Sequence, residues 1–198
     1  MQRQAKQLIA EKKFAEAKQP LEMMRKLYPN DASGDGHHVL LARVHRELKE
    51  TPQERAVLES LAKLTDDSVD LFSRLAELTS QAGEWEQARG HVQRWLAISP
   101  LQPAPHRIAA EEGEKLHDDR LAIDSYQALL LLNPIDVADL HLKLATAFQR
   151  SGNLPTAKRH ALLALEEAPR FRAAHQRLLE IIRAMDAAGA KSVERGSK

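Results

Sequence analysis

The sequence contains no cysteine, few aromatic residues and almost no net charge. Its 198 residues include two tryptophans, two tyrosines and four phenylalanines, and 29 basic groups stand against 28 acidic ones, a net of +1. Without cysteine the chain can form no disulfide, no zinc–thiolate site and no thiol nucleophile. The near-zero total charge also argues against a dedicated nucleic-acid binder, which normally carries a basic excess.

Long apolar runs are absent as well. No stretch approaches the ~18 apolar residues of a membrane-spanning helix, and the N-terminal residues MQRQAKQLIAEKK are too polar for a secretory signal. We therefore expect a soluble protein with no membrane partner, cytoplasmic by default. The location would be periplasmic if a longer parent chain carries a signal, since the first predicted repeat is incomplete and indicates an excerpt.

What the sequence does contain is a repeat that ends in proline. Pro29, Pro100, Pro134 and Pro169 close the same pattern, and the last three are spaced by 34 and 35 residues. Alanines stand twelve and twenty-four residues before these prolines: Ala17, Ala88, Ala122 and Ala157, then Ala5, Ala76, Ala110 and Ala145. A period of this length predicts two-helix units, which bury their apolar faces by stacking on their neighbours.

The repeat predicts an all-α protein, a right-handed α-solenoid of antiparallel helix pairs with a C-terminal capping helix. We expect one domain over residues 1–188, followed by a frayed tail over 189–198. Alanine suits the helix crossings because a larger side chain would push the backbones apart, and glycine suits the turns. The predicted units cover residues 1–30, 36–66, 68–100, 103–134 and 137–169, with the cap over 170–188.

The second unit matches the repeat less well than the others, and the apolar faces of two further helices have to be assigned from the spacing of their residues. In the second unit Asp66 replaces the closing proline and Glu54 replaces the small residue, which predicts a looser or shifted crossing. Helical spacing places the apolar stripe of the second helix on Phe14, Ala17, Leu21, Met24 and Leu27. In the cap it places the stripe on Leu178, Leu179, Ile182 and Met185.

The third unit, residues 69–100, resembles the tetratricopeptide repeat. Its aromatic, aliphatic, small, turn and breaker positions hold Phe72, Leu75, Ala76, Gly83, Trp85, Ala88, Val92, Trp95 and Pro100. The fifth unit is similar, with Leu144, Ala145, Phe148, Gly152, Leu154, Ala157 and Pro169. The resemblance covers most of residues 1–169 and implies a helical repeat scaffold for protein–protein interaction.

No motif indicates an enzyme, a metal site or a cofactor. His38, His106 and His141 occupy the repeat position that Phe72 occupies in the third unit, so we interpret them as packing residues. Consecutive units are offset by ~10 Å, so these histidines cannot share one metal ion. Metalloprotease, phosphate-loop and serine-hydrolase motifs are missing too.

In this family the first helices of successive units line a concave groove, and residues beside their core stripe point into it. That rule selects ten candidate binding residues: Asp70, Ser73, Glu77, Arg107, Glu111, Glu114, Asp139, Leu142, Thr146 and Gln149. Their acidic bias predicts a partner peptide or helix with basic and apolar residues. The alternative interpretation is that they are ordinary solvated charges, which is the usual state of surface carboxylates.

Further hypotheses stay open. The family's chaperone-tail binders hold a terminal carboxylate with lysine, asparagine and arginine, whereas Ser73, Glu77 and Glu111 stand here, so we do not expect that ligand. The chain could be the docking arm of a larger enzyme such as a peptidase, with catalysis upstream of residue 1. Net charges of +4 over residues 1–29, −8 over 30–149 and +5 over 150–198 also allow homo-oligomers. RNA binding has little support, because Phe171 is the only aromatic in the basic C-terminal stretch.

Overall fold

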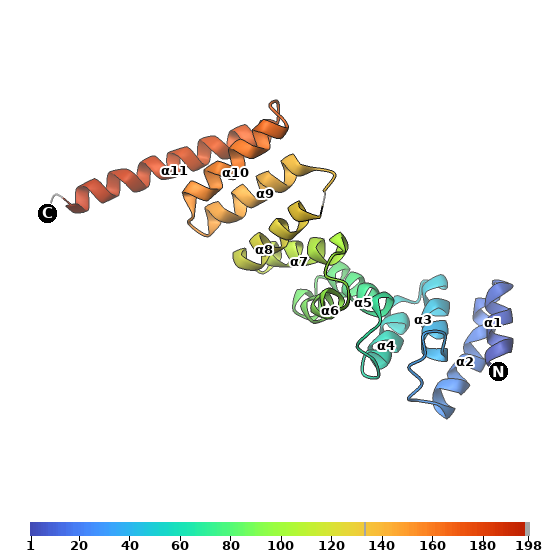
Figure 1. Ribbon diagram of the computed structural model, residues 1–198. Helices are drawn as coiled ribbons and strands as arrows, with labels where there is room; N and C mark the ends of the chain where they lie inside the picture. The colour runs from blue at the N-terminus through green and yellow to red at the C-terminus, as the bar shows by residue number, and fades with distance from the viewer. Residues whose placement is uncertain (133, 197–198) are drawn as a thin grey trace. The chain divides into compact units, whose positions relative to one another are not determined.

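A computed structural model describes residues 1–132 and 134–196, and the side chains through residue 189. Among these residues the backbone forms eleven helices and no strand (Figure 1), which confirms the all-α prediction. They group into two compact units, Met1–Pro100 and Leu101–Lys198. Unit 1 holds α1 (Gln2–Ala10), α2 (Phe14–Leu27), α3 (His37–Glu47), α4 (Thr51–Leu61), α5 (Val69–Gln81) and α6 (Trp85–Ile98). Unit 2 holds α7 (Pro103–Lys115), α8 (Asp119–Leu131), α9 (Val137–Arg150), α10 (Leu154–Glu167) and α11 (Arg172–Gly196).

Each predicted repeat range contains one pair of helices joined by a three-residue turn. The second turn residue has a positive φ in every pair: 75° at Gly83, 81° at Gly152, and 57° to 59° at Lys12, Lys49 and His117. At Gly83 the following N–H, of Glu84, donates to the carbonyl of Thr79 at 2.9 Å, which closes the end of α5. Glycine adopts this left-handed conformation without steric cost. The predicted role of the turn glycines is confirmed.

The alanines of the repeat lie where the two helices of a pair cross. All eight, from Ala5 to Ala157, have at most 1% of their surface exposed. The pair α7–α8 comes close enough that a Cβ added to Gly113 would lie 2.6 Å from the backbone nitrogen of Ala122. A methyl group or a hydrogen is therefore all that these crossings accommodate, as the sequence predicts.

Helix ends follow the proline and N-cap signals. Helices α2, α6 and α10 each end two residues before a repeat proline, and α8 ends three residues before Pro134. Asp118 and Asp136 cap the helices that follow them, because their carboxylates accept the backbone N–H groups of Leu121 and Asp139 at 3.1 and 2.9 Å. These contacts satisfy N–H groups that a helix start leaves unpaired.

Two predicted apolar registers need correction. Leu27 is 56% exposed at the last position of α2, where the chain already turns away from the core. In α11 the side that faces the core holds the buried Ala174 and Ile181 and the partly buried Leu178 and Met185, and Leu179 is 55% exposed. The spacing of four, three and four residues keeps one side of the helix against α9 and α10. Because Leu178 and Leu179 are adjacent and both apolar, the sequence alone was compatible with either one facing the core.

The C-terminal helix also continues past the predicted cap. The backbone is helical through Gly196, so residue 189 does not mark the end of the helix. Residues 197–198 lie outside the described part of the chain. The single domain over residues 1–188 stays a prediction. No helix among the described residues is both long and apolar enough to cross a bilayer.

In the second repeat a buried ion-pair cluster takes the place of the small residue. Glu54 of α4 is 1% exposed, and its Oε1 accepts the Nε hydrogens of Arg46 and Arg74 at 2.7 Å each. Nη2 of Arg74 donates to the other oxygen, Oε2, at 2.9 Å. Burial raises the pKa of Glu54, but the hydrogen bonds from Arg74 and Arg46 outweigh it and lower that pKa overall. The cluster joins α3, α4 and α5.

We expect the Ala157→Leu variant to lose about 1–3 kcal/mol of unfolding free energy, because the larger side chain cannot fit at the α9–α10 crossing. Urea denaturation followed by circular dichroism measures the change. Ala187→Leu, on the exposed side of α11, is the matched control and should change stability by less than ~0.5 kcal/mol. Equal stability of the two variants would contradict the assigned crossing.

We expect Glu54→Gln to destabilise unit 1 by about 3 kcal/mol, the lower end of the range for breaking a buried ion pair. The lower end applies because Arg46 is half-exposed and Arg74 keeps a second carboxylate partner in Glu77. The same urea experiment serves, with Asp124→Asn as the control because that exposed carboxylate has a single weak pair, 3.9 Å from Arg120. A loss no larger than the control's would show that the cluster contributes little.

Candidate functional site

Unit 2 presents two adjoining clefts on the side formed by its first helices α7 and α9 and by α11, which we call the first-helix face. The tyrosine cleft has a volume of about 220 Å³ and is lined by Arg107, Glu111, Tyr126, Leu129, Pro134, Ile135, Asp136, Asp139, Leu140 and Lys143. The arginine cleft, of about 250 Å³, is lined by Glu114, Leu142, Lys143, Thr146, Ala173, Gln176, Arg177 and Glu180. Lys143 lines both, so the clefts are neighbours.

Six of the ten predicted binding residues line these clefts. Three are in the tyrosine cleft (Arg107, Glu111 and Asp139) and three in the arginine cleft (Glu114, Leu142 and Thr146). A seventh, Gln149, accepts a hydrogen bond at 3.1 Å from Nη1 of Arg177, at the arginine cleft. The repeat rule thus selects residues that the fold of unit 2 brings together.

The three predicted residues of unit 1 lie on α5 and line neither cleft. The Ser73 hydroxyl donates to the carbonyl of Asp70 at 3.2 Å, within the helix. Glu77 accepts from Nη1 of Arg74 at 3.1 Å, so its carboxylate is already paired with the buried cluster around Glu54. Of the three, Asp70 and Glu77 are exposed.

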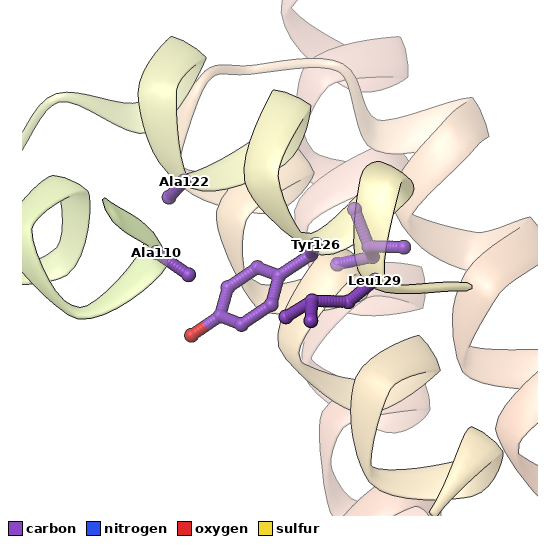
Figure 2. Packing of buried hydrophobic residues seen from close by; sticks show 5 residues of the cluster. Ala110, Ala122, Tyr126 and Leu129 are labelled. Carbon is purple, nitrogen blue, oxygen red and sulfur yellow. The ribbon is translucent and has the colours of Figure 1, made fainter. Parts of the chain in front are cut away.

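Tyr126 connects the two clefts. This residue comes from α8, lies in the apolar cluster with Ala110, Ala122 and Leu129 (Figure 2), and is only 3% exposed. Its hydroxyl donates to Oε1 of Glu114 at 2.5 Å. Burial, followed by that hydrogen bond and by nearby carboxylates, raises the pKa of Tyr126, so the phenol stays neutral and keeps its proton on the Glu114 side.

Lys143 lines both clefts and makes two contacts within unit 2. Its Nζ lies 3.2 Å from Oδ2 of Asp139, one turn earlier on α9, and 5.7 Å from the centre of the Tyr126 ring. An ammonium group over an aromatic face is attracted to the ring as well as to the carboxylate. In the arginine cleft Arg177 donates to Glu180 at 2.7 Å.

The charge of the tyrosine cleft is acidic overall, with Glu111, Asp136 and Asp139 against Arg107 and Lys143. The arginine cleft is balanced. Apolar side chains supply the remaining lining of the tyrosine cleft, and Ile135 at its rim is 99% exposed. Such a surface suits a partner that offers an apolar side chain next to a basic one.

Solved structures similar to this chain share its architecture across most of its length. A crystal structure of MamA matches with a TM-score of 0.65 and 16% identity, covering 86% of this chain and 90% of the MamA chain. YrrB, described as a TPR protein with an unusual peptide-binding site, matches with a TM-score of 0.64, 14% identity and 87% coverage of both chains. A tetratricopeptide repeat protein from Parabacteroides merdae matches with a TM-score of 0.59 and 16% identity, covering 98% of this chain and 76% of that protein's chain. The chain has the tetratricopeptide repeat fold.

A scan against protein-family models finds no match, and neither does a search of the curated proteins. The fold likeness confirms the resemblance stated from the sequence. At identities of 14–16% it establishes the architecture alone, because one fold hosts many functions.

Sequence reasoning missed Tyr126, Lys143 and Arg177. The repeat rule considers only first helices, and Tyr126 reaches the first-helix face from α8, a second helix. The sequence did contain a signal for Lys143, because Asp139 stands four residues earlier and this spacing pairs opposite charges on a helix. Arg177 belongs by sequence to a solvated basic end, and only the packing of α11 against α9 brings it to Gln149.

Two of the three histidines at the aromatic repeat position, His38 and His141, pack as the sequence predicts, and the packing role of His106 stays a prediction. His38 is 3% exposed, and its Nε2 lies 3.2 Å from the carbonyl oxygen of Pro29. His141 meets His160 of α10, with their Nδ1 atoms 3.0 Å apart, and His160 stacks on Phe148 at 5.4 Å. Among the described residues no three histidine, aspartate or glutamate side chains gather closely enough to hold a metal ion.

The His141–His160 pair makes unit 2 sensitive to acid. Burial and the neighbouring imidazole lower the pKa of His160 to about 4, and burial also lowers that of His141. Because the unfolded chain binds protons near pH 6.5, it takes up more protons than the folded chain between pH 6.5 and 4. The stabilising contribution of the two neutral histidines is therefore complete above pH 6.5 and is lost as the pH falls from 6.5 to 4.

We expect the melting temperature to fall between pH 7.5 and 5, and to fall less in the His160→Phe variant. Phenylalanine keeps the stack on Phe148 and removes the titrating group. Differential scanning calorimetry at both pH values gives the comparison. If the variant and the parent lost the same number of degrees, other groups would account for the acid sensitivity.

Proposed function

We propose that this protein is an interaction scaffold whose first-helix face in unit 2 binds a peptide or helix of a partner protein. The observation that carries the proposal is the pair of clefts around Lys143, lined by six residues that the repeat pattern selects as groove positions. YrrB, a protein of the same fold, is described as having a peptide-binding site.

The chemistry of the clefts defines the partner. An apolar side chain fits beside Leu129, Leu140 and the exposed Ile135, where its burial removes apolar surface from water. A lysine or arginine next to it reaches Glu111 at the cleft wall, whereas Asp139 is already paired with Lys143. The partner segment is therefore basic and apolar, and neither a membrane nor a nucleic acid is required.

Contact, and not catalysis, is the role we assign to these side chains. The hydroxyl of Tyr126 is committed to Glu114 and the ammonium of Lys143 to Asp139, so both act as fixed parts of the surface. We infer no enzymatic activity and no cofactor for this chain. Service as the docking arm of a larger enzyme and self-association remain hypotheses, and no contact among the described residues favours either.

Selection from a random peptide library tests the proposal, because such a library samples many combinations of charged and apolar residues. We expect peptides enriched on the intact chain to contain lysine or arginine beside an apolar residue. Their dissociation constants, measured by isothermal titration calorimetry, should rise at least tenfold in Glu111→Lys, because the substitution places like charges together.

Asp124→Lys is the matched control, because Asp124 is an exposed carboxylate of α8 that lines neither cleft. It makes the same change of total charge and should leave the affinity unchanged. Enriched peptides that bind Glu111→Lys as tightly as the parent would place recognition away from the tyrosine cleft and refute the proposal.

A further inference from the structure

Unit 1 carries a separate groove between its second helices α4 and α6. This α4–α6 groove has a volume of about 530 Å³, and the lining residues that matter here are Glu59, Lys63, Glu86, Gly90, His91 and Arg94. All of them belong to unit 1, and none belongs to the first helices that the repeat rule selects. The groove is therefore independent of the clefts in unit 2.

Gly90 leaves the floor of this groove open. It lies in the interior of α6, where glycine costs up to ~1 kcal/mol relative to alanine. A Cβ added to Gly90 would meet no atom within 4 Å, so packing inside the unit does not call for glycine. One repeat further along, the equivalent position on α8 holds Asp124. The missing side chain lets another backbone approach closely.

The groove is acidic at one end of α6 and basic at the other. Glu86 and Arg94 are eight residues apart, or about 12 Å along a helix. Next to the acidic end, Arg55 donates to Glu59 at 2.7 Å, to Glu84 at 2.6 Å and to Gln87 at 2.5 Å. This network fixes α4 against α6 and neutralises the Glu59 carboxylate.

At the basic end two cations lack a carboxylate partner. Nη1 of Arg94 donates to the carbonyl of Ala62 at 3.2 Å, and its guanidinium lies 5.3 Å from the Phe72 ring centre, so the side chain is held in place. Within the described residues no carboxylate is at ion-pair distance from Arg94 or Lys63. Arg46, Arg55 and Arg74, on α3, α4 and α5, each have a carboxylate partner.

His91 adds an unused polar group to the same end. Its ring stacks on Phe72 at 6.5 Å, and in the described part of the chain neither ring nitrogen has a hydrogen-bond partner. Burial lowers the pKa of His91, so the imidazole is neutral at pH 7 and offers one donor and one acceptor.

We propose that the α4–α6 groove binds an α-helix of a protein partner, which places a small residue over Gly90 and a carboxylate between Lys63 and Arg94. A helix is the occupant because a groove between two helices accepts the ridge of a third. An acidic partner is indicated by charge complementarity with the two cations that have no carboxylate partner.

Alanine-based helical peptides test this proposal in NMR titrations of the full ¹⁵N-labelled chain. One peptide carries two glutamates near its C-terminus, and the other carries glutamines in their place. We expect the glutamate peptide to shift the backbone amides of residues 59–63 and 86–94, and the glutamine peptide to shift them much less. Arg94→Ala should weaken binding at least fivefold, and Gly90→Leu should abolish it.

Gly90→Leu fills only open space, so it should melt at the parental temperature or above, which separates lost binding from lost folding. Asp124→Leu adds the same side chain at the equivalent position of α8 and should bind like the parent. Equal shifts with both peptides, no shifts in these residues at millimolar peptide, or binding retained by Gly90→Leu would each overturn the proposal. Concentration-dependent shifts of the same amides without peptide would assign the groove to a second copy of the chain and overturn it too.

These outcomes are independent of the proposed function in unit 2. Shifts confined to residues 101–189 would eliminate the α4–α6 groove as a site for acidic helices and leave the first-helix face untouched. Loss of binding in Glu111→Lys would likewise have no bearing on Lys63 or Arg94, because these residues belong to different compact units.

Discussion

The close crossing of two helices over an alanine is the constraint on which four of the five repeats depend. Alanines such as Ala88 and Ala157 are fully buried, and their methyl groups set the distance between the paired backbones. That distance fixes the rotation of each helix, and the rotation decides which side chains reach the core and which point outward. The first-helix face and the α4–α6 groove are both formed by side chains that this packing leaves on the outside.

Glu54 shows how the same constraint is met with different chemistry. A carboxylate is too large and too polar for an alanine crossing, and its burial alone would be costly. Arg46 and Arg74 supply the compensating donors from the two neighbouring helices. The arrangement has a directional property that an apolar contact lacks, because a bidentate arginine fixes both distance and orientation. The second repeat therefore achieves with hydrogen bonds what the other repeats achieve with close packing.

Much of the fold could be predicted from the sequence because its signals are local and repeated. Counting back from the prolines locates most helix pairs, since proline and the turn glycine act on their own segment of backbone. Predictions failed where the answer depends on another helix. Leu178 and Leu179 are equally apolar, and only the position of α9 and α10 selects Leu178. Glu54 stands out in the sequence as an exception, but its partner Arg74 lies twenty residues away, on the next helix but outside any local pattern.

The candidate binding site was likewise predictable where it depends on the repeat register and was not where it depends on the packing of other helices. Groove positions such as Glu111 and Leu142 follow from repeat register, which the sequence contains. The charge that this surface presents to a partner depends also on which side chains are neutralised by their neighbours. Those neighbours are known only once the packing of the helices is known. Glu77 has the register of a groove carboxylate but is paired with Arg74. Lys63 and Arg94, on a face that the repeat rule ignores, have no carboxylate partner among the described residues. A census of unpaired charges among the described residues therefore suggests candidate binding surfaces that periodicity alone does not, since an ion pair formed within the chain is no longer available to a partner.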